Sequence, residues 1–234
     1  EIMPMWYFQY VDGRRTDLLG LFPQITADYP TLGHVLDLAL STGRPVYLIK
    51  EMPGIEIKVE AEEVGKLWRV RGPAADAEPA YANHAVLGDA VALDGHDRRP
   101  EKPLPGDTVQ VSLIWEALRP VDTVYHSYVH LQDEGGQTVT QSDRQPGGVY
   151  YPTTVWQPGE HLKDDHLLRI PADAPQGIYH IVAGMYSLSE DGALQHLGEP
   201  VVIGQISLNA GALVAPGDPG QSVLAFPAVL VSSP

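Results

Sequence analysis

The sequence predicts an α+β protein: a small N-terminal α/β unit, containing a strand–helix–strand (βαβ) motif and a hairpin, followed by an antiparallel β-sandwich of the Ig-like or jelly-roll kind. Three observations predict this. Residues 32–40 carry apolar side chains at helical spacing. Apolar and polar residues alternate, with the period of a half-buried strand, over much of the chain after residue 80. Turn signals rich in Gly, Pro and Asp separate these alternating segments.

Charge and composition exclude several classes of protein. The chain has 234 residues, with 15 Lys+Arg against 30 Asp+Glu and a net charge of −15. We expect no nucleic-acid partner, because such an interface needs a basic stripe to meet phosphates. The chain has no cysteine, which excludes disulfides and thiolate metal sites. No apolar run is long enough to span a bilayer.

The chain divides near residue 75. Residues 1–75 carry a net charge of −2 and residues 76–234 a net charge of −13. The change falls within a small-residue, proline-containing stretch that is typical of a linker or a long surface loop. We expect an α/β unit over 1–75, a sandwich over 76–210, and a tail or added edge strand over 211–234.

The first elements predict a parallel arrangement. Residues 17–22 (DLLGLF) form a short apolar run that indicates a buried strand. The helix over 32–40 follows, with Asp28 or Thr31 as its N-cap and Gly43 as its stop. A second strand after that helix would complete a βαβ motif with a right-handed crossover.

That second strand is expected over residues 46–50 (VYLIK). Residues 55–62 and 67–71 then predict a hairpin. Residues 6–10 fit either a short helix or an entering strand.

The sandwich strands alternate clearly in two segments, 108–116 and 124–133. In the second segment, Tyr125, Val129 and Leu131 are expected to face the core. Further strands are expected over 85–93, 137–143, 166–170, 178–187 and 200–208.

Two histidines are candidate metal ligands. His126 and His130 lie four residues apart on a strand and so share one face, and His180 and Tyr186 have the same parity on another strand. No metalloprotease-type spacing supports a metal there, so we favour a solvated sheet face that carries polar aromatics. We expect no cofactor.

The loop over 145–159 is the candidate carbohydrate contact. Tyr150, Tyr151 and Trp156 combine apolar ring faces with polar edges, as a sugar-binding surface requires. The alternative is that Trp156 closes the end of the sandwich and anchors a long loop.

A hydrolytic site is a further hypothesis. Asp143, Asp165 and His166 could supply acid–base chemistry, although adjacent strand residues point to opposite faces. A role at a turn and a strand entry is the alternative for this segment. Neither a Gly-x-Ser-x-Gly elbow nor a phosphate-binding fingerprint occurs, so we assign no catalytic residue to the chain.

Two segments of the first part carry a family resemblance. Residues 6–17 (WYFQYVDGRRTD) and 43–47 (GRPVY) resemble the segment after the last membrane helices of bacterial multi-pass glycosyltransferases, the protein O-mannosyltransferase-like proteins of the GT-C type. The second part resembles the β-sandwich appended to some of them. The matching residues there are Trp115, His130, Leu131, Gln141, Asp143, Pro152, Thr153, Thr154, Trp156, Gly159, Glu160, Asp165, Ile170, Pro171, Pro175, Gly177 and Tyr179.

This resemblance implies a non-catalytic, extracytoplasmic region tethered to the membrane through an upstream part of the same chain. The family's catalytic acidic residues and lipid-linked sugar donor site would lie upstream, so none is carried over. The implied partners are that membrane domain and a glycan or glycosylation acceptor. A first residue, Glu1, that is not methionine fits a fragment or a processed chain. A free-standing carbohydrate-binding or structural β-sandwich protein is the alternative.

Overall fold

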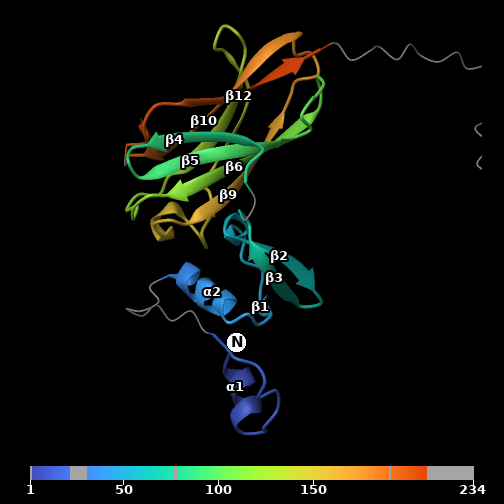
Figure 1. The fold of residues 1–234 in the computed structure, drawn as a ribbon, viewed down its shortest axis with the longest axis vertical. Helices are drawn as coiled ribbons and strands as arrows, with labels where there is room; N and C mark the ends of the chain where they lie inside the picture. The colour runs from blue at the N-terminus through green and yellow to red at the C-terminus, as the bar shows by residue number, and fades with distance from the viewer. Residues whose placement is uncertain (1, 22–30, 76–77, 190, 210–234) are drawn as a thin grey trace, which may run out of the picture.

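The structure, a computed structural model, describes residues 2–21, 31–75, 78–189 and 191–209. Figure 1 shows two parts arranged along the long axis, a sandwich of strands and a smaller part with helices and a small sheet. Within the described ranges, no helix has both the length and the apolar character needed to cross a bilayer. The predicted tail or edge strand over 211–234 lies outside the described residues.

Two α-helices belong to the N-terminal part, α1 (Ile2–Tyr10) and α2 (Leu32–Ser41). The aromatic segment that fitted either a helix or a strand lies in α1. Helix α2 begins after Thr31, whose hydroxyl accepts a hydrogen bond from a backbone N–H of the first turn. The chain leaves α2 through Gly43 at a φ of 66°, so both predicted capping residues act as expected. Asp28, the other N-cap candidate, lies outside the described residues.

A small antiparallel sheet completes this part. Its strands lie in the order β1-β3-β2, and a 3₁₀ turn, η1, precedes β2. The hairpin of β2 and β3 confirms the predicted one, although its first residues form η1 instead of strand. The elements are β1 (Val46–Leu48), η1 (Ile55–Ile57), β2 (Val59–Val64) and β3 (Leu67–Pro73).

The expected parallel βαβ motif is not found among the described residues. β1 pairs antiparallel with β3, with Val46 opposite Val70. Residues 17–21 form no strand, and Phe22 lies outside the described residues. The backbone carbonyl of Asp17 instead accepts a hydrogen bond from the Arg44 guanidinium. A short apolar run does not by itself specify a strand, and the nearby hairpin supplies β1 with a local partner.

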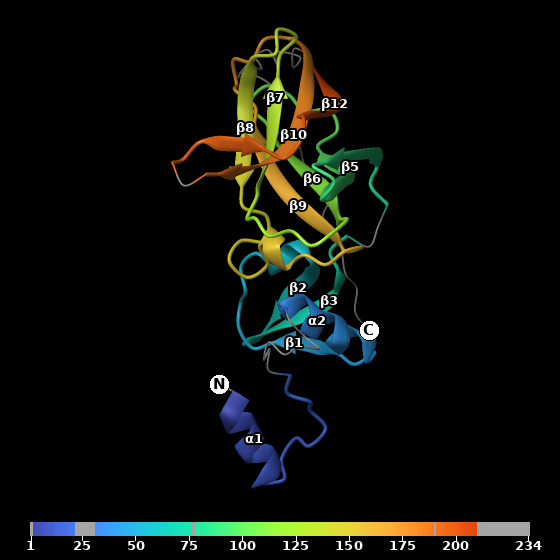
Figure 2. The same ribbon diagram turned by 90° about the vertical axis from the view of Figure 1, so that its left-hand side faces the viewer.

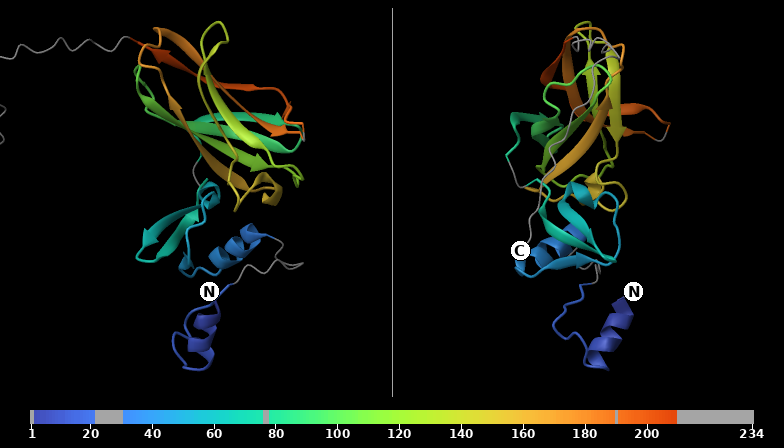
Figure 3. Two further views of the ribbon diagram at one scale, coloured as in Figure 1. Left: turned by 180° about the vertical axis from the view of Figure 1, so that it is seen from behind. Right: turned by 90° about the vertical axis from the view of Figure 1, so that its right-hand side faces the viewer.

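Two antiparallel sheets form the sandwich, as Figures 2 and 3 show. Sheet I has the order β4-β5-β6-β9, and sheet II has the order β11-β10-β7-β8, with β12 also paired to β10. The strands of sheet I are β4 (Tyr81–Leu87), β5 (Val91–Arg99), β6 (Thr108–Ala117) and β9 (His161–Arg169). Those of sheet II are β7 (His126–Gln132), β8 (Thr138–Arg144), β10 (Gly177–Leu188), β11 (Leu194–His196) and β12 (Val201–Leu208).

Two predicted sandwich strands differ from the observed ones by more than two residues. The single strand expected over 85–93 is split between β4 and β5 by a tight turn, where Gly88 and Asp89 have φ of 53° and 54°. Positive φ at both central residues suits the right-handed twist of a hairpin. β9 begins at His161, five residues before the predicted start at 166.

The core lies between the two sheets and follows the predicted alternation. Along β6, the fully buried side chains include Leu113 and Trp115. Along β7, Val129 and Leu131 are fully buried as predicted, whereas Tyr125 is half-buried just before the strand. The period of two therefore assigned the inward face of both strands correctly.

Candidate functional site

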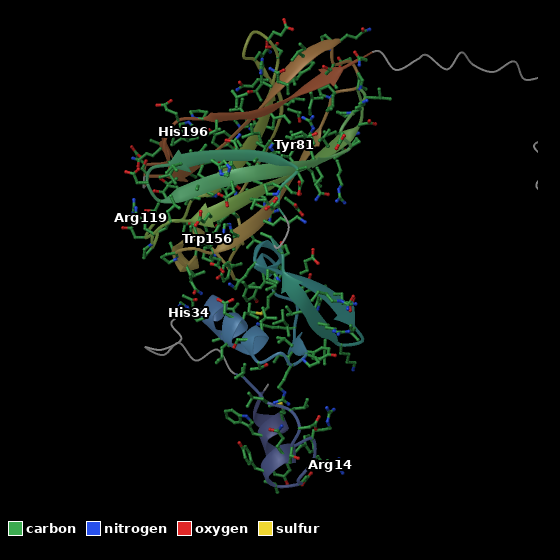
Figure 4. The ribbon with its side chains drawn as sticks, in the orientation of Figure 1. Arg14, His34, Tyr81, Arg119, Trp156 and His196 are labelled. Atoms are coloured by element: carbon green, nitrogen blue, oxygen red, sulfur yellow. The ribbon has the colours of Figure 1, made fainter. Side chains whose placement is uncertain are left out.

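The aromatic loop between β8 and β9 packs inward. Tyr151 and Trp156 are almost completely buried, and η2 (Thr153–Val155) lies between them. The Trp156 indole N–H donates a hydrogen bond to the Tyr151 carbonyl at 3.1 Å. Figure 4 labels Trp156 at the end of the sandwich that faces α2. Trp156 therefore closes this end, which is the alternative considered for it above.

This burial corrects the expected exposed carbohydrate platform. The rings of Tyr151 and Trp156 are covered by protein, so neither presents a face on which a sugar could stack. Tyr150, the third candidate, stays partly exposed, and the Lys50 ammonium lies 5.4 Å from its ring centroid. The sequence contains these rings, but the burial of Tyr151 involves the distant N-terminal part, because Gly33 of α2 and Lys58 both lie against it.

Those contacts form a junction of charged and polar groups that is largely buried, with Asp37 at its exposed edge: Asp37, Lys58, Tyr151, Gln157 and Glu160. Lys58 is only 6% exposed, forms an ion pair with Glu160, and lies 3.0 Å from Asp37. The Tyr151 hydroxyl donates to Glu160 at 2.7 Å, and the Gln157 backbone N–H donates to it at 3.0 Å. The buried carboxylate is thus compensated by one cation and two neutral donors, as a buried charge requires.

The junction is closely packed and poorly solvated. Burial raises the pKa of Tyr151 well above its usual range, and the neighbouring Glu160 carboxylate raises it further, so the phenol remains a donor. A Cβ on Gly33 of α2 would lie 2.1 Å from the Tyr151 hydroxyl. A Cβ on Gly54 would lie 1.9 Å from the Gly147 carbonyl oxygen. Glycine at these positions lets the two parts of the chain approach closely.

A second polar cluster is sealed between the sheets. The Ser127 hydroxyl of β7 donates to Asp164 of β9 at 2.5 Å and lies 3.1 Å from His166 Nε2. His166 Nε2 is 3.0 Å from the same Asp164 oxygen. Burial opposes ionisation of Asp164, but its contacts with His166, Ser127 and Arg144 outweigh burial and lower its pKa. The cluster links sheet I to sheet II across the core.

This cluster lacks the arrangement of a catalytic triad. Serine and aspartate both meet the same histidine nitrogen, whereas a relay needs them on opposite nitrogens. Ser127, Asp164 and His166 are all at most 1% exposed, so a substrate has no access. Asp165 points away and accepts a hydrogen bond from Ser112, so it does not pair with Asp143 beside His130 on sheet II. The hydrolytic hypothesis gains no support.

The two candidate metal ligands lie on the outward side of sheet II. His126 stacks on Tyr186 with ring centroids 5.3 Å apart. His130 Nε2 lies 3.4 Å from an Asp143 carboxylate oxygen, and its ring lies 4.7 Å from that of Tyr128. In the part of the chain that the structure describes, no three His, Cys, Asp or Glu side chains are placed to hold a metal ion. The face is a partly exposed cluster of polar aromatics.

The likenesses of this chain to known proteins are structural and distant. No family model and no curated protein matches it. Among solved structures, the C-terminal domain of wzt is similar at 12% identity and a TM-score of 0.41, covering 63% of this chain and 92% of that one. The sporulation control protein Spo0M from Bacillus subtilis is similar at 14% identity and a TM-score of 0.28, covering 52% of this chain and 50% of that one. Likenesses this distant say nothing about a shared function.

Proposed function

We infer that the chain is a non-catalytic β-sandwich module on the extracytoplasmic side of a membrane glycosyltransferase, where it positions a glycan or a glycosylation acceptor. The observation that carries this inference is the buried junction. Segments 6–17 and 43–47, which carry half of the family resemblance, belong to the N-terminal part. Glu160, which belongs to the other half, joins the sandwich to that part through Lys58.

A positioning role requires that the sandwich be held in one orientation relative to whatever it is attached to. The junction supports such a role because separation of the two parts would break the ion pair of Lys58 with Glu160. Separation would also expose the Tyr151 ring, which lies against α2. The sealed serine–histidine–aspartate cluster supports a structural role for the core instead of catalysis.

The test begins with the native gene. The reading frame upstream of Glu1 should encode several apolar segments of about 20 residues each, the length of membrane-spanning helices. In the full-length protein, Lys58→Ala should lower the transfer of sugar to acceptor per molecule of protein in the membrane. The matched control is Lys50→Ala, which removes a lysine outside the junction. A start codon or a cleavable signal just upstream of Glu1 would refute the proposal.

The alternative function is a free-standing carbohydrate-binding or structural sandwich. The partly exposed aromatics of sheet II favour the carbohydrate-binding form over the structural form, because a purely structural spacer has no need of them. It predicts glycan binding by a secreted protein that has no membrane segment upstream, so the same gene sequence distinguishes the two.

A further inference from the structure

Sheet II gathers polar aromatic side chains on its outward side. The strand register sets them in rows, with Tyr186 of β10 opposite His126 of β7 on one side and His196 of β11 on the other. In the next row, Tyr128 lies between Gly184 and Asp143. We call the following residues the outer face: His126, Tyr128, His130, Gln141, Asp143, Gly184, Tyr186 and His196.

Tyr128 is the central support of the outer face. Its hydroxyl would lie 2.4 Å from a Cβ on Gly184, so the ring extends over the glycine where other residues would project a side chain. The rings of His130, His196 and Tyr186 surround it at centroid distances of 4.7, 5.8 and 6.1 Å. Tyr128 itself is 3% exposed. The partly exposed rings therefore rest on a packed base and are held in place before any ligand arrives.

Polar ring atoms lie within this cluster. His126 Nδ1 is shielded from solvent and has no hydrogen-bond partner among the described residues, and His130 Nε2, also shielded, lies 3.4 Å from an Asp143 carboxylate oxygen. Tyr128 and Tyr186 remain neutral phenols, since burial and the Asp143 carboxylate raise the pKa of both, that of Tyr128 to about 12.

The chemistry of the outer face selects the ligand. It has no Lys or Arg to attract an anion, and its one carboxylate, Asp143, repels one. Hydroxyl groups both donate and accept, so they match imidazole nitrogens, the Gln141 amide and a carboxylate oxygen together. Apolar C–H surfaces fit the half-buried faces of His126 and Tyr186. A hydroxyl-rich ligand with C–H faces and no charge meets all of these demands.

We propose that the outer face of sheet II binds a neutral oligosaccharide, with the partly exposed rings of Tyr186 and His126 contacting the C–H surface of a sugar and His130, Gln141 and Asp143 binding its hydroxyls. This site rests on the proposed function and names where the glycan would contact the chain. It also relocates the contact from the loop over 145–159, whose rings are largely buried, to the sheet.

Affinity electrophoresis of the full 234-residue chain tests the site. The probes are gels containing mannan, dextran or xylan as neutral polysaccharides, and polygalacturonate as an acidic one. At least one neutral polysaccharide should retard the protein, and polygalacturonate should not. Tyr186→Ala should weaken the interaction at least tenfold, because it removes the exposed ring without touching the core. Tyr47→Ala, an exposed tyrosine on the N-terminal sheet, should change nothing.

Two results would overturn the site. One is the absence of retardation by every neutral polysaccharide, and the other is retardation that Tyr186→Ala leaves unchanged. Tyr150→Ala separates this failure from failure of the proposed function. If Tyr150→Ala abolishes binding and Tyr186→Ala does not, glycan contact stands but belongs to the loop. If the gene encodes no membrane segments and Tyr186→Ala still abolishes binding, the site stands and the glycosyltransferase context falls.

Discussion

Replacing His96 with phenylalanine should make the protein markedly less sensitive to mild acid. The His96 side chain is completely buried in the sandwich, where its ring stacks on Tyr81 with centroids 4.9 Å apart. Neither ring nitrogen has a hydrogen-bond partner among the described residues. Burial, helped by the nearby Arg98 guanidinium, lowers the pKa of His96 from 6.5 to about 4. The folded protein therefore resists a proton that the unfolded chain accepts readily.

The size of the effect follows from those two pKa values. Because the folded pKa is depressed, the full stability is present above pH 6.5 and is lost as the pH falls toward 4. Linkage gives a loss of about 2 kcal/mol at pH 5 and about 3 kcal/mol at pH 4 from this one residue. This loss is a substantial part of the free energy of unfolding of a typical domain, which is about 5–15 kcal/mol.

Urea unfolding followed by circular dichroism measures this directly. The free energy of unfolding of the wild type and of His96→Phe should be compared at pH 7.5, 6 and 5, and the gap between pH 7.5 and pH 5 should shrink by about 2 kcal/mol in the variant. The control is His180→Phe, which removes a half-buried histidine from the surface of sheet II and should leave the gap close to that of the wild type. An equal loss of stability in wild type and His96→Phe would refute the reasoning.

Three further predictions concern the buried contacts. Lys58→Ala leaves Glu160 buried and unpaired and should cost about 3–5 kcal/mol in urea unfolding, whereas a cost below about 1 kcal/mol would mean that the pair is solvated. Asp164→Ala removes the carboxylate between the sheets and should cost about 3 kcal/mol or more, and unchanged thermal unfolding would contradict a sealed cluster. Gly33→Ala forces a shift against the Tyr151 hydroxyl and should cost about 1–3 kcal/mol, with faster proteolysis at the junction as the readout.

Local patterns predicted the strands of the sandwich well, because the alternation of apolar and polar residues that forms a strand can be seen within the strand itself. The alternation that buries Val129 and Leu131 is visible within a few residues, and so is the Thr31 cap of α2. The parallel βαβ motif failed for the opposite reason. The residues of β1 do not specify their partner, which is β3 of the following hairpin, and the apolar run over 17–22 contains nothing that specifies a partner either.

For the candidate site, too, local features were predicted from the sequence and contacts between distant segments were not. Strand parity correctly grouped His126 and His130 on one face, together with Tyr186. Strand parity could not indicate that Tyr151 is covered, because part of its cover comes from Gly33 of α2, far earlier in the chain. The ion pair of Lys58 with Glu160 has no local signature either, since neither residue lies in a recognisable motif.

The junction has a consequence for how the molecule unfolds. Each half of the chain completes the other, because Tyr151 fills space against α2 while Glu160 neutralises Lys58. Separating the two pieces near residue 75 would therefore break the ion pair of Lys58 with Glu160 and uncover the Tyr151 ring. The two halves should melt together in a single cooperative transition, even though each has its own sheet. The boundary at which the chain changes charge is thus a poor place to divide it into independently folding pieces.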